Sequence, residues 1–181
     1  PTVADDIKTS AIWSILFALV AIALYILVRF RNIAFSIGAV VGLVHDVLFI
    51  LGIYSIFYSI MPFSLEIDQS FIAAILTVIG YSINDTVVVF DRIRENVGLY
   101  PKRALNELIN MSVNSTLSRT FSTSFSTALP LLAMFIFGGE TIRGFVFAIL
   151  LGVIVGTYST IFIASPIAYD IQQKQAKKAQ K

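Results

Sequence analysis

Five long apolar runs, separated by short polar segments, are the dominant pattern along the chain. They cover residues 9–28, 32–60, 70–90, 119–137 and 143–168. A helix needs roughly 20 mainly apolar residues to cross the hydrocarbon core of a bilayer, and each run is about that long or longer. The pattern therefore predicts an all-α fold, a polytopic transmembrane helix bundle of five spans.

The one long connection, residues 91–118, carries a second pattern. After Pro101, apolar residues recur at helical spacing, at Ala104, Leu105, Leu108, Ile109 and Val113. This spacing predicts a cytoplasmic amphipathic connector helix on the membrane surface, with Pro101 near its first turn. A plain solvated connector is the alternative.

The remaining segments are short. Residues 1–8 form an extracytoplasmic lead-in, residues 9–168 the transmembrane domain, and residues 169–181 a basic cytoplasmic tail that we expect to be disordered. The first residue is Pro1, so we expect a processed, trimmed or partial chain. The first apolar run lacks the features of a signal peptide.

The composition agrees with a membrane protein and excludes two kinds of site. Of 181 residues, 57% are hydrophobic and only 13% are charged, whereas a soluble domain is about one quarter charged. The chain contains no cysteine, which excludes a disulfide framework and a cysteine-based metal site.

The distribution of basic residues predicts the orientation in the membrane. If the amino terminus lies outside, the inside segments are 29–31, 91–118 and 169–181, and these hold ten of the thirteen Lys and Arg residues. The outside segments hold only Lys8 and Arg143. The positive-inside rule therefore predicts an extracytoplasmic amino terminus and a cytoplasmic carboxyl terminus.

Four ionisable residues lie within or at the edge of the apolar runs, where each costs a few kcal/mol and usually faces a bundle interior or a water-filled cavity. They are His45 and Asp46 in the second run, Asp85 in the third and Arg119 at the start of the fourth. At about 1.5 Å per residue, Asp46, Asp85 and Arg119 lie roughly 21, 22 and 27 Å from the outer ends of their spans. We therefore expect the three charges in one slab of the membrane.

Two interpretations of these charges are open. Burial and a nearby guanidinium act in opposite directions on the proton affinity of a carboxylate, so Asp85 beside a mobile Arg119 would bind and release a proton in turn. Asp85, Arg119 and Asp46 would then form a proton relay that couples proton flow to a change of shape. The alternative is a static buried ion pair that only holds the helices together.

Small polar residues surround the charged ones and would support a relay. Ser82, Asn84 and Thr86 lie within one turn of Asp85, and the fourth run is rich in serine and threonine, Ser122 among them. Such hydroxyls line water paths or satisfy backbone carbonyl groups. Small residues also let membrane helices pack closely, and both roles stay open.

Other motifs carry less information. Two glycine pairs have the four-residue spacing of close helix contacts in membranes: Gly38/Gly42 and Gly152/Gly156. His45 next to Asp46 does not make a metal site, because the chain has no second histidine and a site needs more ligands. We expect a packed or hydrogen-bonded histidine instead. With no nucleotide-binding loop, catalytic triad or nucleic-acid signature, we expect neither an enzyme nor a nucleic-acid partner.

Four segments together resemble the membrane region of the SecF family, or of the SecF half of fused SecDF proteins. They read GLVHDVLFILG, IGYSINDTVVVFDRIREN, NSTLSRTFSTS and FGGETIRGF, and their order and spacing agree over nearly the whole chain. The resemblance implies the last five spans of a membrane protein of the resistance-nodulation-division type. It also implies that the preceding span and the extracytoplasmic domain are not part of this sequence.

The resemblance further implies a function and partners. Proteins of this family lie in the plasma (inner) membrane and use the proton motive force in late steps of preprotein translocation. By position, Asp85 and Arg119 match the family's essential charged pair. The implied partners are a SecD half or subunit, the translocon channel SecYEG, YidC, the unfolded preprotein and membrane lipid. The proton is the implied coupling ion, sodium is the alternative, and no further cofactor is expected.

Two other functions are weighed against this one. A proton-driven small-molecule exporter of the same superfamily would need extracytoplasmic substrate-binding domains, which this sequence lacks. A non-transducing structural subunit of the translocon would tolerate neutralisation of Asp85.

Overall fold

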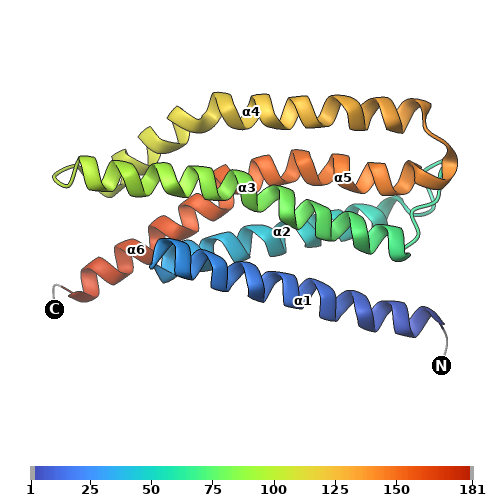
Figure 1. Ribbon diagram of the computed structural model, residues 1–181, viewed down its shortest axis with the longest axis horizontal. Coiled ribbons are helices and arrows are strands. Elements are labelled where there is room, and N and C mark those ends of the chain that lie inside the picture. Colours follow the sequence, from blue (N-terminus) through green and yellow to red (C-terminus); the bar gives the residue numbers. More distant parts are fainter. Residues whose placement is uncertain (1–2, 180–181) are drawn as a thin grey trace.

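The computed structural model describes residues 3–179 as a bundle of long helices (Figure 1). The helices are α1 (Val3–Phe30), α2 (Ile33–Phe57), α3 (Gln69–Leu99), α4 (Leu105–Phe137), α5 (Glu140–Ser159) and α6 (Ser165–Ala179). A single π-helical turn, η1 (Thr160–Ala164), joins α5 to α6 without a break. Five helical stretches of the described residues are long and apolar enough to cross a membrane, the last being Glu140–Lys178. The predicted all-α bundle of five spans is confirmed.

Successive spans run in opposite directions, with α5 and α6 forming one span, so the connections alternate between the two ends of the bundle (Figure 1). The beginning of α1, the α2–α3 loop and the α4–α5 turn lie at one end. The α1–α2 turn, the α3–α4 loop and the end of α6 lie at the other, which we call the basic end because it carries most of the Lys and Arg residues.

Local sequence explains where the helices begin and end. Arg31 has a φ of 51°, a left-handed conformation that ends α1 and starts the tight turn into α2. The side chain of Asn32 then accepts a hydrogen bond from the backbone N–H of Ala34. At α3, the carboxylate of Asp68 accepts from the N–H of Phe71, at 2.8 Å. Both residues are side-chain caps of the kind that satisfy free N–H groups at a helix start.

The interior of the bundle is formed by α2, α3 and the α5–α6 stretch, with α1 and α4 on the outside. In α1 and in α4, only 6% of each helix's apolar membrane-spanning stretch is buried, whereas in α2 the buried share is 56%. Two apolar clusters make up the interior, one around Ile50, Ile75 and Ile149, the other around Phe35, Phe90 and Ala164. Along α3 and the α5–α6 stretch, a polar segment separates the two clusters.

The glycine pairs lie at close helix contacts, as their spacing predicts. A Cβ atom on Gly38 would lie 2.6 Å from the carbonyl oxygen of Ala164, so α2 and η1 touch through their backbones. On α5, a Cβ on Gly152 would overlap the side chain of Val78, and a Cβ on Gly156 would lie 3.0 Å from Ser82. The absence of a side chain at these positions therefore lets α2, α3 and α5 approach closely.

The predicted connector helix is wrong as a separate element within the described residues. The segment 91–118 is divided between the end of α3 and the beginning of α4, and α4 then continues to Phe137. The apolar positions that suggested a surface helix are covered by the bundle: Leu108 is buried, and Ile109 and Val113 pack against the cluster around Phe90. Pro101 lies in the loop before α4 and not in a first helical turn.

The expected disorder of the basic tail is also wrong for the residues that the structure describes. Helix α6 extends to Ala179. The side chain of Gln173 donates to the hydroxyl of Tyr169 one turn earlier, at 2.9 Å. Lys177 and Lys178 lie in the last turn, where a positive charge stabilises a helix.

Candidate functional site

Asp46 lies at the centre of a buried polar layer made by α2, α3 and the end of α5. The residue is fully buried. Oδ2 accepts hydrogen bonds from Oγ of Ser82 on α3, at 2.7 Å, and from Oγ of Ser159 on α5, at 2.9 Å. Oδ1 lies 3.2 Å from Nδ1 of His45. Both carboxylate oxygens thus have polar partners, as a buried charged group requires, and Asp46 holds three elements together.

Asp85 is also buried, but its surroundings differ. It is 4% exposed and lies on α3 one turn after Ser82, about 4.5 Å further along the axis. Among residues 3–179, its carboxylate has no hydrogen bond and no ion pair. Asp46 and Asp85 therefore occupy nearly one level of the bundle, the first fully hydrogen-bonded and the second free.

Arg119 lies on α4, which packs against the helix that carries Asp85. It is exposed on α4 and lines a pocket between α3 and α4 with Asp91, Arg92 and Glu95, on the basic-end side of Asp85. No ion pair joins Arg119 to Asp85 in the described part of the chain. Asp85 and Arg119 lie on the neighbouring helices α3 and α4. Their action as a pair stays a prediction.

Hydroxyl pairs extend the polar layer on both sides. Oγ1 of Thr86 lies 2.9 Å from Oγ1 of Thr160 in η1. Ser124 of α4 and Thr157 of α5 form a buried pair of the same kind at 2.5 Å. Through these contacts each interior helix and α4 is linked to its neighbour by a polar group within the span, where no water competes for the bond.

Two of the predicted supporting residues lie elsewhere. Ser82 and Thr86 belong to the polar layer, but Asn84 and Ser122 are exposed, on the outer faces of α3 and α4. The buried face of α4 instead carries Thr120 and Ser124. The serines and threonines of this helix occur so densely that their spacing did not indicate which of them point inward.

The contribution of the fifth span to the polar layer was not predicted. Ser159 and Thr160 contact Asp46 and Thr86, although neither was proposed as a site residue. A signal was available, because the segment GTYSTIF places four hydroxyl residues together inside an otherwise apolar run. Such a group in a membrane span indicates a polar contact with another helix.

His45 is a packed histidine, as predicted. Its ring lies 6.3 Å from that of Tyr158 and 6.1 Å from that of Phe49, and its Nδ1 faces Asp46. No group of three or more potential metal-ligating side chains occurs in the part of the chain that the structure describes.

Replacing both Ser82 and Ser159 by alanine is expected to destabilise the bundle, since Oδ2 of Asp46 would lose both donors. Each lost hydrogen bond to this buried group is expected to lower the free energy of unfolding by about 1–3 kcal/mol. Unfolding in detergent, followed by circular dichroism, measures the change. Ser126→Ala is the control, because this exposed serine bonds only within α4. Equal stability of the double variant and the control would contradict this role.

Five apolar helices around an interior layer of carboxylates and hydroxyls define a polytopic α-helical membrane protein with ionisable groups inside its spans. The chain belongs to the family described as "Protein export membrane protein SecD/SecF, C-terminal", whose model matches residues 1–174. The resemblance found in the sequence motifs is thereby confirmed.

Curated relatives and a solved structure agree with the family. The chain is 53% identical to "Protein translocase subunit SecF" of Rhodothermus marinus over 178 residues, which cover 98% of this chain and 58% of that protein. The subunit of the same name from Rhodobacter capsulatus is 49% identical and is covered to 48%. The crystal structure of SecDF in a super-membrane-facing form matches the whole chain, with a TM-score of 0.86 and 38% identity, over 24% of its own length. The chain thus spans about half the length of the curated relatives it matches.

Proposed function

We propose that this chain provides the membrane part of a SecF-type subunit that couples proton flow to late steps of preprotein translocation through the Sec translocon. The observation that carries the proposal is the state of Asp85: a carboxylate that is buried within a span and has no hydrogen bond among the described residues, while the neighbouring helix α4 carries Arg119. A group that binds and releases protons needs such freedom. The names of the relatives supply the process that the proton flow would drive.

The two buried carboxylates would have different roles in this relay. Asp46 accepts hydrogen bonds from Ser82 and Ser159 and lies against Nδ1 of His45, so it would act as the fixed member of the relay and position α3 through Ser82. Asp85 would carry the proton, and Arg119 would favour its release when the guanidinium approaches. One charge moved across about 100 mV releases about 2.3 kcal/mol, which biases a two-state element roughly fiftyfold.

We further propose that the outer face of α4 contacts SecD. Exposed polar residues follow one side of this helix, at Ser118, Ser122 and Ser126, next to Arg119 at the edge of the pocket between α3 and α4. Polar groups at this depth are expensive against lipid tails, so another protein surface is the better neighbour. The matching solved structure is a SecDF protein of which this chain covers 24%, which leaves room for such a partner. SecYEG, YidC and the unfolded preprotein are proposed as partners from the family alone.

The chain is a multi-pass membrane protein. We propose that it lies in the plasma (inner) membrane, with its basic end in the cytoplasm. Arg29, Arg92, Arg94 and Arg103 all lie near this end, and the positive-inside rule assigns such an end to the cytoplasm. The beginning of α1 would then be extracytoplasmic.

The alternatives receive less support. The relatives are named as translocase subunits, which favours protein export over small-molecule export and a transport role over an enzymatic one. A purely structural subunit would not explain why Asp85 is left without a partner while Asp46 is fully hydrogen-bonded.

Arg119→Met in the full-length protein is expected to remove the proton-gradient-dependent part of export, because the charge that would displace the proton from Asp85 is lost. The rate at which a secreted protein is released is measured in membrane vesicles that contain SecD and the translocon, with and without a proton gradient. The expected rate with a gradient falls to the rate measured without one.

Lys102→Met is the matched control, because it removes one positive charge from the loop at the basic end, away from Asp85. It is expected to keep the gradient effect. Gradient-dependent export by Arg119→Met at the normal rate would refute the relay. Replacing the proton gradient by a sodium gradient in the same vesicles identifies the coupling ion.

A further inference from the structure

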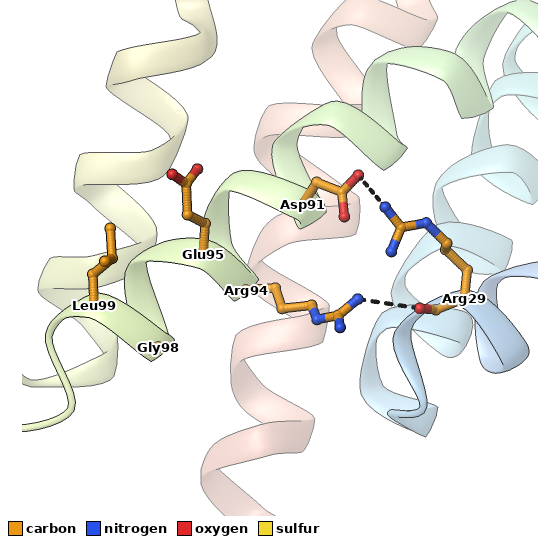
Figure 2. Close-up of a pocket in the computed structure, with 6 residues that line it drawn as sticks. All are labelled: Arg29, Asp91, Arg94, Glu95, Gly98 and Leu99. Atoms are coloured by element: carbon orange, nitrogen blue, oxygen red, sulfur yellow. Dashed lines mark hydrogen bonds and ion pairs between the residues drawn. The ribbon is translucent and has the colours of Figure 1, made fainter.

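A charged pocket at the basic end, distinct from the polar layer, lies between the last turn of α1 and the end of α3. Figure 2 shows its lining: Arg29 from α1, and Asp91, Arg94, Glu95, Gly98 and Leu99 from α3. We propose that this pocket binds the phosphate headgroup of an anionic phospholipid. The proposal does not depend on the proton relay or on the export function.

The hydrogen bonds of the pocket join α1 to α3 but leave donors free. Nη2 of Arg29 pairs with Oδ2 of Asp91 at 2.9 Å, and both side chains are 41% exposed. Nη1 of Arg94 donates to the backbone carbonyl oxygen of Arg29 at 3.3 Å (Figure 2). A guanidinium has five N–H donors, so each arginine retains donors for the oxygens of a phosphate. Two such planar groups suit a phosphodiester, which accepts paired hydrogen bonds.

The charge of the pocket is positive once its ion pairs are taken into account. Asp91 is compensated by Arg29. Glu95 points away from these two residues in Figure 2 and pairs with Arg92 at 2.7 Å. Arg94 has no carboxylate partner in the described part of the chain. Its charge therefore remains to attract an anion.

The walls of the pocket favour a lipid over a soluble anion. Exposed apolar residues of α1 precede Arg29 in the chain, among them Leu24 and Val28, the latter 76% exposed. Leu99 on the opposite side is 60% exposed. Acyl chains would run along this surface of α1, which places the attached headgroup at the level of Arg29 and Arg94. Basic pockets at the cytoplasmic ends of membrane helices are recognised as sites for anionic headgroups.

The floor of the pocket has space for a headgroup. Gly98 is exposed, and a Cβ atom built on it would meet no atom within 4 Å. Its φ is not in the left-handed region, so a larger residue fits the backbone there. A bulky side chain at this position would fill the pocket and leave every charged group in place.

The test measures phospholipid retained by the full-length protein after purification from bilayers of phosphatidylcholine mixed with phosphatidylglycerol, by native mass spectrometry. Arg94→Gln is expected to lower the retention of phosphatidylglycerol about fivefold, the effect of one basic residue at a membrane surface. Gly98→Phe is expected to lower it to a similar extent. Lys102→Gln removes the same charge from the neighbouring loop and is expected to leave retention unchanged.

Two results would overturn the proposal. Equal retention of phosphatidylglycerol by the wild type, Arg94→Gln and Gly98→Phe would show that the pocket binds no lipid. Displacement of the lipid by inorganic phosphate would show a site for soluble anions. Arg94 also caps the end of α1, so its loss weakens that helix end. The Gly98→Phe variant, which keeps all charges, makes the test independent of that effect.

Discussion

Replacing Asp85 by asparagine in the full-length protein is expected to abolish the proton-gradient-dependent part of preprotein export while the bundle stays folded. Asparagine has nearly the same shape but cannot bind or release a proton. Asp85 makes no hydrogen bond in residues 3–179, so the substitution breaks none of those described. The loss is expected to be complete, equal to the roughly fiftyfold bias that one charge moved across about 100 mV provides. Vesicle assays of secreted-protein release, with and without a gradient, measure it.

Two further variants give this experiment its contrast. Asp170→Asn makes the same change at an exposed position of α6 and is expected to export normally. Asp46→Asn is expected to lower stability, because Ser82, Ser159 and His45 are arranged around a carboxylate. Full gradient-dependent export by Asp85→Asn would mean that Asp85 carries no proton.

Replacing Gly152 by alanine is expected to destabilise the contact between α3 and α5 severely. The added methyl group would overlap the side chain of Val78, which is completely buried. Valine is stiff at χ1 and cannot turn away, so the helices must separate. Overpacking of this kind costs about 1–3 kcal/mol, and here the backbone must shift as well. Thermal unfolding in detergent measures the change.

Gly80→Ala provides the matched control within α3. A Cβ atom at Gly80 meets nothing within 4 Å, and the residue is exposed. Alanine favours a helix over glycine by about 1 kcal/mol, so this variant is expected to be as stable as the wild type or slightly more stable. If Gly152→Ala unfolded at the same temperature as Gly80→Ala, the close contact of α3 and α5 would not be needed for stability.

The spans could be predicted from the sequence because membrane insertion depends on a local property, the length of an apolar run. The prediction of a separate connector helix was wrong, because packing between helices decides where that segment lies. Leu108, Ile109 and Val113 show a helix with one apolar face, but the pattern does not say what covers it. Here the end of α3 does, and Asn96 of α3 donates to Ser112 of α4 at 2.7 Å within this contact. A surface helix and an extension of a span therefore have the same sequence pattern.

The charged residues of the candidate site could be predicted from the sequence, but most of its hydroxyl residues could not. A carboxylate inside a span is rare and costly, so Asp46 and Asp85 were identifiable as single residues. Serine and threonine are common in spans because their hydroxyl groups can hydrogen-bond to a backbone carbonyl of the same helix, as Thr77 does to the carbonyl of Ala73. Only the fold selects those that reach another helix. The π-helical turn η1, which presents Thr160 to Thr86, also has no signal that we could read from the sequence.

The two kinds of helix contact in this bundle have different mechanical properties. At Gly38, Gly152 and Gly156 the helices interlock sterically, and sliding them would drive atoms into one another. Helix α4 contains no glycine. Hydroxyl pairs such as Ser124–Thr157 join its middle part to the interior, and a hydroxyl can exchange one hydrogen-bond partner for another. Helices α2, α3 and α5 are thus interlocked at their glycines, whereas α4 is held by apolar contacts, such as those of Val113 and Phe135, and by hydroxyl pairs between them. The segment of α4 between these apolar contacts, where exchangeable hydroxyl pairs lie, is the one that carries Arg119.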